Sequence, residues 1–288
     1  MLNLRLAVIG DIHHGPDSFT KRGPAALPLL ERFIQQANAA NVKAVVDLGD
    51  RISDRDTEHD LLLQREVAAR FADLNVERHH VCGNHDLDFL SLQQNEDILD
   101  RPLGSRVVTI AGLRTLFWQP DVNLRRHPGL RLAPGDLDWL ATTLPADDAP
   151  TLLVSHVPLS GQAMDGNFWF ERNPTFAAYA ETPAIRAVLG SCPGPLACLA
   201  GHVHWNSVTV VDGIPHFTLQ SLTESFTTSG LPSEAAGVIE FSDGVLHFSV
   251  SGHDPFAVSL PFERTRRRWT APLPPFQMEP HYAERAGD

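Results

Sequence analysis

Cysteine is scarce in this sequence, which has only Cys82, Cys192 and Cys198 among its 288 residues. A small, odd number of cysteines argues against a disulfide framework and is typical of a reducing compartment. Long hydrophobic runs are also missing, and no apolar stretch approaches the roughly 20 residues that cross a bilayer. The first residues, MLNLRLAVIGD, lack the basic segment and long apolar stretch of a signal peptide. We therefore expect a cytoplasmic protein with no membrane partner.

Positive charge is in short supply as well, because 23 Lys and Arg face 35 Asp and Glu and leave a net charge of −12. An acidic chain is a poor binder of polyanions, so a long nucleic acid is not an expected partner. A small phosphate ester can still enter, since bound metal cations would reverse the charge locally. The length suits one large domain, or one domain with a small appendage.

The first hundred residues alternate between short apolar runs and helical patterns, which predicts a largely parallel sheet flanked by helices. The expected strands are Leu4–Gly10, Val42–Leu48 and Glu77–Cys82, and the expected helices are Ala25–Ala40, Glu58–Leu74 and Leu87–Leu99.

The later chain contains several hairpin signals, in which two strand-like runs flank a Gly-containing turn. These pairs are Arg106–Ile110 with Arg114–Trp118, Ser207–Val211 with His216–Leu219, and Val238–Phe241 with Val245–Val250, so we expect the end of the chain to be antiparallel. Between them we expect strands Thr151–Val154 and Leu196–Ala200 and helices Leu137–Leu144, capped by Asp136, and Pro183–Leu189.

Two segments have no core-forming pattern. Residues 158–182, rich in Gly, Asn, Phe and Trp, predict a long loop or lid. Its Phe168–Phe170 run (FWF) is expected either to belong to the core or to form a substrate wall or a dimer contact. The Pro/Arg-rich tail 256–288 is expected to be loose or to act as an oligomerisation arm. The remaining 1–255 are expected to form the main domain.

Five short polar clusters each follow an apolar strand-like run, and they supply two carboxylates, one amide and four imidazoles as metal-ligand candidates. The clusters are Asp11 with His13, Gly49-Asp50, Gly83-Asn84-His85-Asp86, His156, and Gly201-His202-Val203-His204. In α/β sheets, ligands bind beyond the carboxyl ends of the strands, so these distant residues can converge. Such a set of ligands suits two adjacent divalent metals. Sites with two such metals typically catalyse the hydrolysis of phosphate esters. Gly10, Gly49, Gly83 and Gly201 each precede a candidate ligand, and we expect them to let the backbone turn sharply.

The five clusters resemble the signature of the calcineurin-like metallophosphoesterase superfamily, which runs DxH, GD, GNH(D/E), H and GHxH. The resemblance covers Leu4 to His204. It implies an α/β fold, a four-layer αββα sandwich of two mixed β-sheets flanked by helices. It also implies a centre of two divalent or mixed-valence metal ions, with Mn, Fe or Zn as the candidates.

The resemblance assigns a role to each residue. Asp11, His13 and His204 would hold the first metal, Asp50 would bridge, and Asn84, His156 and His202 would complete the second. A hydroxide between the metals would attack phosphorus, and His85 would protonate the leaving group. Asp86 would orient His85. Independently of the resemblance, His14, His216 and His253 are expected to be structural or surface histidines, and the charged loop residues Arg51 and Asp54 are expected to face water.

Differences from the signatures of related enzymes narrow the choice of substrate class. Ser53 stands where protein phosphatases have a second Asp and where purple acid phosphatases have a metal-binding Tyr. The chain is similar instead to bacterial class III cyclic-nucleotide and glycerophosphodiester phosphodiesterases, which implies a phosphodiesterase acting on a small substrate. The alternatives are a phosphomonoesterase and, from another class, a non-catalytic scaffold of the same fold.

Overall fold

The computed structural model describes residues 2–124 and 129–263, which contain two six-stranded mixed sheets. In the first sheet, three parallel strands from the start of the chain adjoin three antiparallel strands from its end. Its strand order is β12 (Phe256–Pro261), β11 (Val245–Ser251), β10 (Ala236–Ser242), β1 (Leu4–Ile9), β2 (Ala44–Asp47) and β3 (Glu77–His80).

The second sheet has four parallel strands at its centre and an antiparallel strand at each edge. Its order is β4 (Arg106–Ile110), β5 (Leu113–Phe117), β6 (Thr151–Val154), β7 (Leu196–Ala200), β9 (Ile214–Thr218) and β8 (Ser207–Val211). The late chain is therefore not wholly antiparallel, because β9 pairs in parallel with β7.

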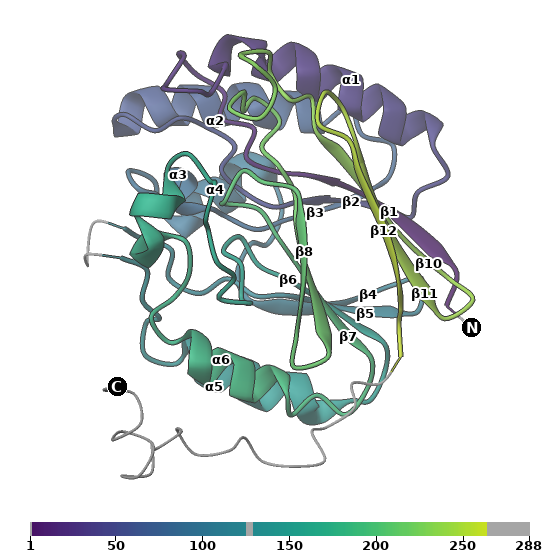
Figure 1. Cartoon of the computed structure of the whole chain (residues 1–288). Helices are drawn as coiled ribbons and strands as arrows, with labels where there is room; N and C mark the ends of the chain where they lie inside the picture. Colours follow the sequence, from purple (N-terminus) through teal and green to yellow (C-terminus); the bar gives the residue numbers. More distant parts are fainter. Residues whose placement is uncertain (1, 125–128, 264–288) are drawn as a thin grey trace, which may run out of the picture.

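Helices cover the outer faces of both sheets, which confirms the predicted four-layer sandwich (Figure 1). The helices α1 (Ala26–Ala39) and α2 (Thr57–Phe71) pack on the first sheet, and α5 (Asp136–Thr143) and α6 (Thr182–Leu189) pack on the second. Two short helices, α3 (Asn84–Leu87) and α4 (Leu92–Leu99), follow β3. The inner faces of the sheets meet in a core of Leu, Val, Ile and Phe side chains.

Local sequence explains where these helices begin. The Asp56 carboxylate accepts the backbone N–H of His59 at 2.9 Å and caps α2, and Ser91 caps α4 in the same way. The prediction of Asp136 as a cap is wrong by one position, because α5 begins at Asp136 itself. Its carboxylate accepts the N–H groups of Ala133 and Asp121 instead.

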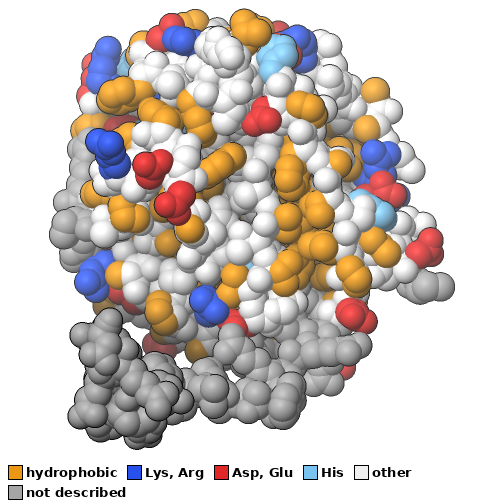
Figure 2. All heavy atoms as spheres, viewed as in Figure 1, with side chains coloured by type: hydrophobic (Ala, Val, Ile, Leu, Met, Phe, Trp, Pro, Cys, Tyr) orange, Lys and Arg blue, Asp and Glu red, His pale blue; other side chains and the backbone are white. Residues whose placement is uncertain are grey.

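The predicted tail begins too early. Phe256–Pro261 form β12, which pairs along its length with β11, so they belong to the first sheet. Their side chains alternate between half-buried and exposed, a weak signal in a Pro-rich stretch. Figure 2 shows hydrophobic side chains gathered between β8 and β12. Val208 of β8 and Val258 and Leu260 of β12 pack against the core between the sheets and are only partly buried. The rest of the predicted arm, residues 264–288, lies outside the described residues.

The segment 158–182 is a long connection as predicted, with only the short 3₁₀ turns Phe170–Arg172 and Pro174–Phe176 before α6. No helix formed by residues 2–124 and 129–263 combines the length and the apolarity that a membrane crossing needs.

Candidate metal centre

The predicted ligands meet where strands of both sheets end. Asp11 and His13 follow β1, Asp50 follows β2, and Asn84 begins α3 after β3; His156 follows β6, and His202 and His204 follow β7. Backbone hydrogen bonds join these loops directly, as Asp11 donates to the Gly49 carbonyl at 2.8 Å and Gly201 donates to the His156 carbonyl at 3.0 Å.

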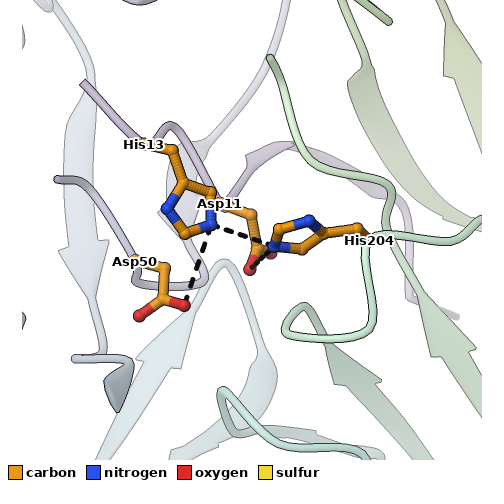
Figure 3. A group of neighbouring side chains, drawn as sticks. All are labelled: Asp11, His13, Asp50 and His204. Atoms are coloured by element: carbon orange, nitrogen blue, oxygen red, sulfur yellow. Dashed lines mark hydrogen bonds and ion pairs between the residues drawn. The ribbon is translucent and has the colours of Figure 1, made fainter. Parts of the chain in front are cut away.

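Four side chains form the first group of possible metal ligands, Asp11, His13, Asp50 and His204, whose ligand atoms all lie within 4.8 Å of one another. Figure 3 shows them pointing toward a common centre. The two imidazole Nε2 atoms of His13 and His204 are 2.9 Å apart, and Asp11 Oδ1 is 3.3 Å from the latter.

Asp50, His156 and His202 form a second group within the same limit. Here His156 Nε2 lies 3.2 Å from His202 Nδ1 and 3.3 Å from Asp50 Oδ2. The same Asp50 oxygen lies 3.9 Å from His13 Nε2 of the first group. Asp50 therefore stands between the two groups, as a bridging ligand must.

Asn84 completes the second group in a way that fits a metal. Its side chain is only 4% exposed, and its Oδ1 has no hydrogen-bond partner among the described residues. A buried amide oxygen without a partner is costly, because it has lost its bonds to water. Since carboxylate, amide and imidazole donors suit divalent transition metals, the residues present fit a metal pair.

Hydrogen bonds on the side away from the metal groups determine which ring nitrogen of each histidine faces the metals. His156 Nδ1 donates to the Leu48 carbonyl at 2.8 Å, and His202 Nε2 donates to the Phe176 carbonyl at 2.7 Å. His204 Nδ1 bonds to the Glu224 carboxylate at 2.9 Å, which leaves Nε2 for a metal. Such carboxylate–histidine pairs orient metal ligands and raise their basicity. The sequence analysis did not find Glu224.

The buried carboxylates and imidazoles of the site shift one another's pKa values. Burial opposes protonation of His156, but the nearby Asp50 carboxylate outweighs it and raises the pKa of His156 to about 9. Burial likewise opposes the charge on His204, and its bonds to Asp11 and Glu224 raise its pKa to about 9. Burial, with the charge of His156, lowers the pKa of His202 to about 3. Metal ions would therefore displace the protons that His156 and His204 carry beside the carboxylates.

The backbone at this site departs from the predicted arrangement. Of the four glycines expected to turn the chain, only Gly49 has a positive φ, of 92°. The left-handed residues are five of the ligand candidates themselves, Asp11 (50°), His13 (48°), Asp50 (53°), His202 (69°) and His204 (50°). Gly83 provides space instead, since a Cβ there would lie 2.1 Å from Asp50 Oδ1.

His85 lies at the edge of the metal groups, with its Nε2 4.0 Å from Asp50 Oδ2. Its Nδ1 makes a short hydrogen bond to the carboxylate of Asp54. The carboxylate that orients His85 is thus Asp54 and not Asp86, which corrects the sequence prediction. Burial would raise the pKa of Asp54, but its bond to His85 lowers it below the ordinary value. Asp54 is therefore an anion beside the imidazole.

Asp86 has a different task. Its buried carboxylate accepts the backbone N–H groups of Asp50 (2.8 Å), Arg51 (3.0 Å) and Gly83 (2.9 Å) and the side chain of Gln64 (2.7 Å). It thereby ties the loop that carries the bridging ligand to the loop that carries Asn84.

Arg51 was expected to face water, but it is completely buried. Its guanidinium pairs with Asp47 at 2.8 Å and with Asp86 at 3.2 Å and donates to the Val81 carbonyl. Its role beneath the site is structural. A structural role was also expected for His14 and His216. His14 Nε2 bonds to Glu66 at 2.6 Å, and His216 is buried in β9, so both agree with that expectation.

Comparison with known proteins agrees with this geometry. The sequence pattern of the calcineurin-like phosphoesterase family matches residues 4–206, most of the chain. No curated protein matches the sequence. A dimetal phosphatase from Danio rerio has a similar structure, with a TM-score of 0.71 and 17% identity over 90% of this chain and 99% of that one. The phosphopantetheinyl hydrolase of Mycobacterium tuberculosis is more distant, with a TM-score of 0.48 and 16% identity over 75% of this chain and 89% of its own.

The structural similarity, at such low identity, bears on the fold alone. The family match covers every predicted ligand, and the structure brings the six Asp and His ligands together in two adjacent groups with Asn84 beside them. The chain therefore belongs to the calcineurin-like phosphoesterase family.

Proposed function

We propose that the protein is a metal-dependent phosphodiesterase that acts on small phosphate diesters. One observation carries the proposal: two groups of ligands share an oxygen of Asp50 at the floor of an open cavity, with His85 beside them. When bound, a metal pair would polarise the phosphoryl oxygens and lower the pKa of an attacking water.

The chain's own residues account for the proton that the leaving group needs. Because the Asp54 carboxylate can only accept, His85 donates through Nδ1 and keeps Nε2 free on the cavity side. This bond to Asp54 fixes the orientation of the His85 ring. His85 can therefore deliver a proton from Nε2 to the departing oxygen, which is the work of a general acid.

Charge in the cavity supports a diester over a monoester. Among the described residues that line it, Lys21 is the one lysine or arginine, whereas Asp50, Asp88 and Glu224 are acidic. A monoester carries nearly two negative charges at pH 7, and a diester carries one. Beyond the metal ligands and the cations that they would hold, the cavity offers a single cation, which suits the less charged ester better. The second candidate is a phosphomonoesterase, favoured by Lys21 Nζ, which lies 3.5 Å from His13 Nδ1.

The test is hydrolysis of bis(p-nitrophenyl) phosphate and of p-nitrophenyl phosphate by protein supplemented with Mn²⁺, with metal content measured in parallel. We expect about two metal equivalents and a higher kcat/KM for the diester. Asp50→Ala is the control, and it should abolish both activities. Protein that binds no metal would contradict the proposal and favour a scaffold, and a preference for the monoester would favour the second candidate.

Three further expectations belong to this proposal. Mn, Fe or Zn would occupy the site, because mixed imidazole and carboxylate sets accept all three. The three cysteines are buried and free, which supports a cytoplasmic location. The net charge of −12 supports a small substrate over a long nucleic acid.

A further inference from the structure

Aromatic side chains line the cavity at the metal groups. The cavity has a volume of about 290 Å³, and Asp50, Asn84, His202 and His204 lie on its floor. Five of its lining residues are aromatic rings from two separate segments, Phe19, Phe168, Trp169, Phe170 and Phe176.

Phe19 occupies an unfavourable position that the fold itself does not explain. Its side chain is 85% exposed, although burial of a phenylalanine normally contributes to stability. Its backbone is left-handed, with φ at 50°, at a tight turn closed by two hydrogen bonds between Ser18 and Lys21. Backbone strain of this kind concentrates at ligand-binding positions. The same turn places the Lys21 ammonium 3.5 Å from His13 Nδ1, so it presents a ring and a cation to one cavity.

The second segment is fixed to the metal ligands. Asn167 Nδ2 donates to the Val203 carbonyl at 2.9 Å, and Asn167 Oδ1 accepts the N–H groups of Trp169 and Phe170 at 3.1 and 3.0 Å. Because Val203 stands between two ligand candidates, the loop is held in register with the metal groups. Phe168 is nevertheless 48% exposed at this anchored loop.

We propose that the substrate carries a planar aromatic group, such as a nucleobase or an aryl ring, close to the scissile phosphate, and that Phe19 and Phe168 stack on it. This inference rests on the proposed function and selects among its substrates. A ring would cover the two exposed phenylalanines while the phosphate reaches the floor. A glycerol group is too small and too polar to cover them, so glycerophosphodiesters are disfavoured.

The experiment uses three phosphonates that differ only in the group on phosphorus: benzyl-, cyclohexylmethyl- and ethylphosphonate. None has a scissile ester bond, so leaving-group reactivity does not enter. Isothermal titration of the Mn²⁺-loaded protein gives the three dissociation constants. We expect benzylphosphonate to bind about 5- to 100-fold more tightly than ethylphosphonate, the usual worth of one stacked ring. It should also bind more tightly than cyclohexylmethylphosphonate, which is apolar but not planar.

Phe19→Ala and Phe168→Ala should each reduce the benzyl preference several-fold and leave ethylphosphonate binding and metal content unchanged. Leu231→Ala is the matched control, because Leu231 is 57% exposed and is not among the residues lining the cavity. Equal binding of benzyl- and ethylphosphonate, or a preference unchanged in both phenylalanine variants, overturns the inference. If the two phenylalanine variants change only the oligomeric state, from oligomer to monomer, the rings form an interface between copies of the chain and the inference is wrong.

Failure of the proposed function would give a different result. In that case neither nitrophenyl ester is hydrolysed. The binding of the three phosphonates can still be compared, so a preference for benzylphosphonate would support the aromatic site even without hydrolysis. A hydrolase that shows no aromatic preference would retain the proposed function and lose this inference.

Discussion

Replacing Asp86 by Asn tests whether this carboxylate holds the site together or acts on His85. In the structure its Oδ2 accepts the N–H groups of Asp50 and Gly83, and its Oδ1 accepts Gln64 Nε2 and the N–H of Arg51. An asparagine has one oxygen and one NH₂ group. Whichever way the amide turns, two of these four bonds are lost and two buried N–H groups face another donor.

Two effects set the magnitude: the loss of those two bonds, and the removal of an anion that is paired with the Arg51 guanidinium at 3.2 Å but is costly to bury. A hydrogen bond to a charged group contributes about 1.5–3 kcal/mol, so the first expectation is a loss of about 3–6 kcal/mol. Burial raises the pKa of Asp86 even against the charge of Arg51, which shows that placing the anion here has its own cost. The loss should therefore be near the lower value, about 3 kcal/mol. In a domain of this size that lowers the Tm by about 6–12 °C.

The assay is thermal unfolding of metal-free Asp86→Asn followed by circular dichroism, together with metal titration. Asp148→Asn, at an exposed position, is the matched control and should leave the Tm unchanged. Metal binding should weaken as well, because the carboxylate that ties the loop of Asp50 to the loop of Asn84 is lost in either orientation. An unchanged Tm combined with a shifted pH profile of hydrolysis would refute this reasoning and restore Asp86 as the residue that orients His85.

Three shorter predictions concern neighbouring groups. Asp54→Asn should lower turnover about 10- to 100-fold without loss of metal, since it only removes the anion beside His85; loss of metal from this variant would be evidence against that role. Glu224→Gln should weaken metal affinity by a similar factor, measured by competition with a chelator, because Glu224 orients His204. An affinity equal to that of the parent protein would mean that this bond does not support metal binding. Metal binding at pH 7 should release about two protons, since the pKa values of His156 and His204 are raised to about 9 without metal. The apparent affinity for the metal should then rise with pH until about pH 9. The measurement is a titration of the protein with metal in lightly buffered solution, and the absence of proton release would mean that both imidazoles are already neutral at pH 7.

The predicted ligands could be found from the sequence because two simple rules act together. An apolar run of four to seven residues marks a buried strand, and the loop after a parallel strand reaches the same edge of the sheet as its neighbours. Asp50 after β2 and His156 after β6 satisfy both rules. These rules bring together the ligands of each sheet, whereas the meeting of Asp50 with His156 depends on how the two sheets pack.

Adjacency in sequence misled the interpretation of Asp86. It follows His85 directly, but both lie in α3, where consecutive side chains point about 100° apart. Asp86 therefore points away from its neighbour and into the protein, while Asp54 approaches His85 from another loop. Glu224 could not be found, because it lies in the loop after β9 with no motif around it. Only the tertiary structure brings it to His204.

Arg51 illustrates the same limit from the opposite side. An arginine next to a loop aspartate usually remains in water, since burying a lone charge is expensive. Here Asp47 and Asp86 enclose it from a strand and from a helix, and a buried pair is tolerated when its hydrogen bonds are satisfied. The pairing depends on three-dimensional proximity that no local pattern records.

The left-handed backbone of five ligand candidates bears on whether the protein is an enzyme or a scaffold. Residues held in such conformations cost about 1–3 kcal/mol each, so the five together cost about 5–15 kcal/mol. Asp and His tolerate this region better than most residues, which places the total near the lower figure, about 5 kcal/mol. That is still comparable with the whole stability of a typical domain, about 5–15 kcal/mol. Glycine at these positions would remove the strain, but it would bring no carboxylate or imidazole. A scaffold that bound no metal would have no use for these five side chains at strained positions, so their clustering at one site favours the enzyme over the scaffold.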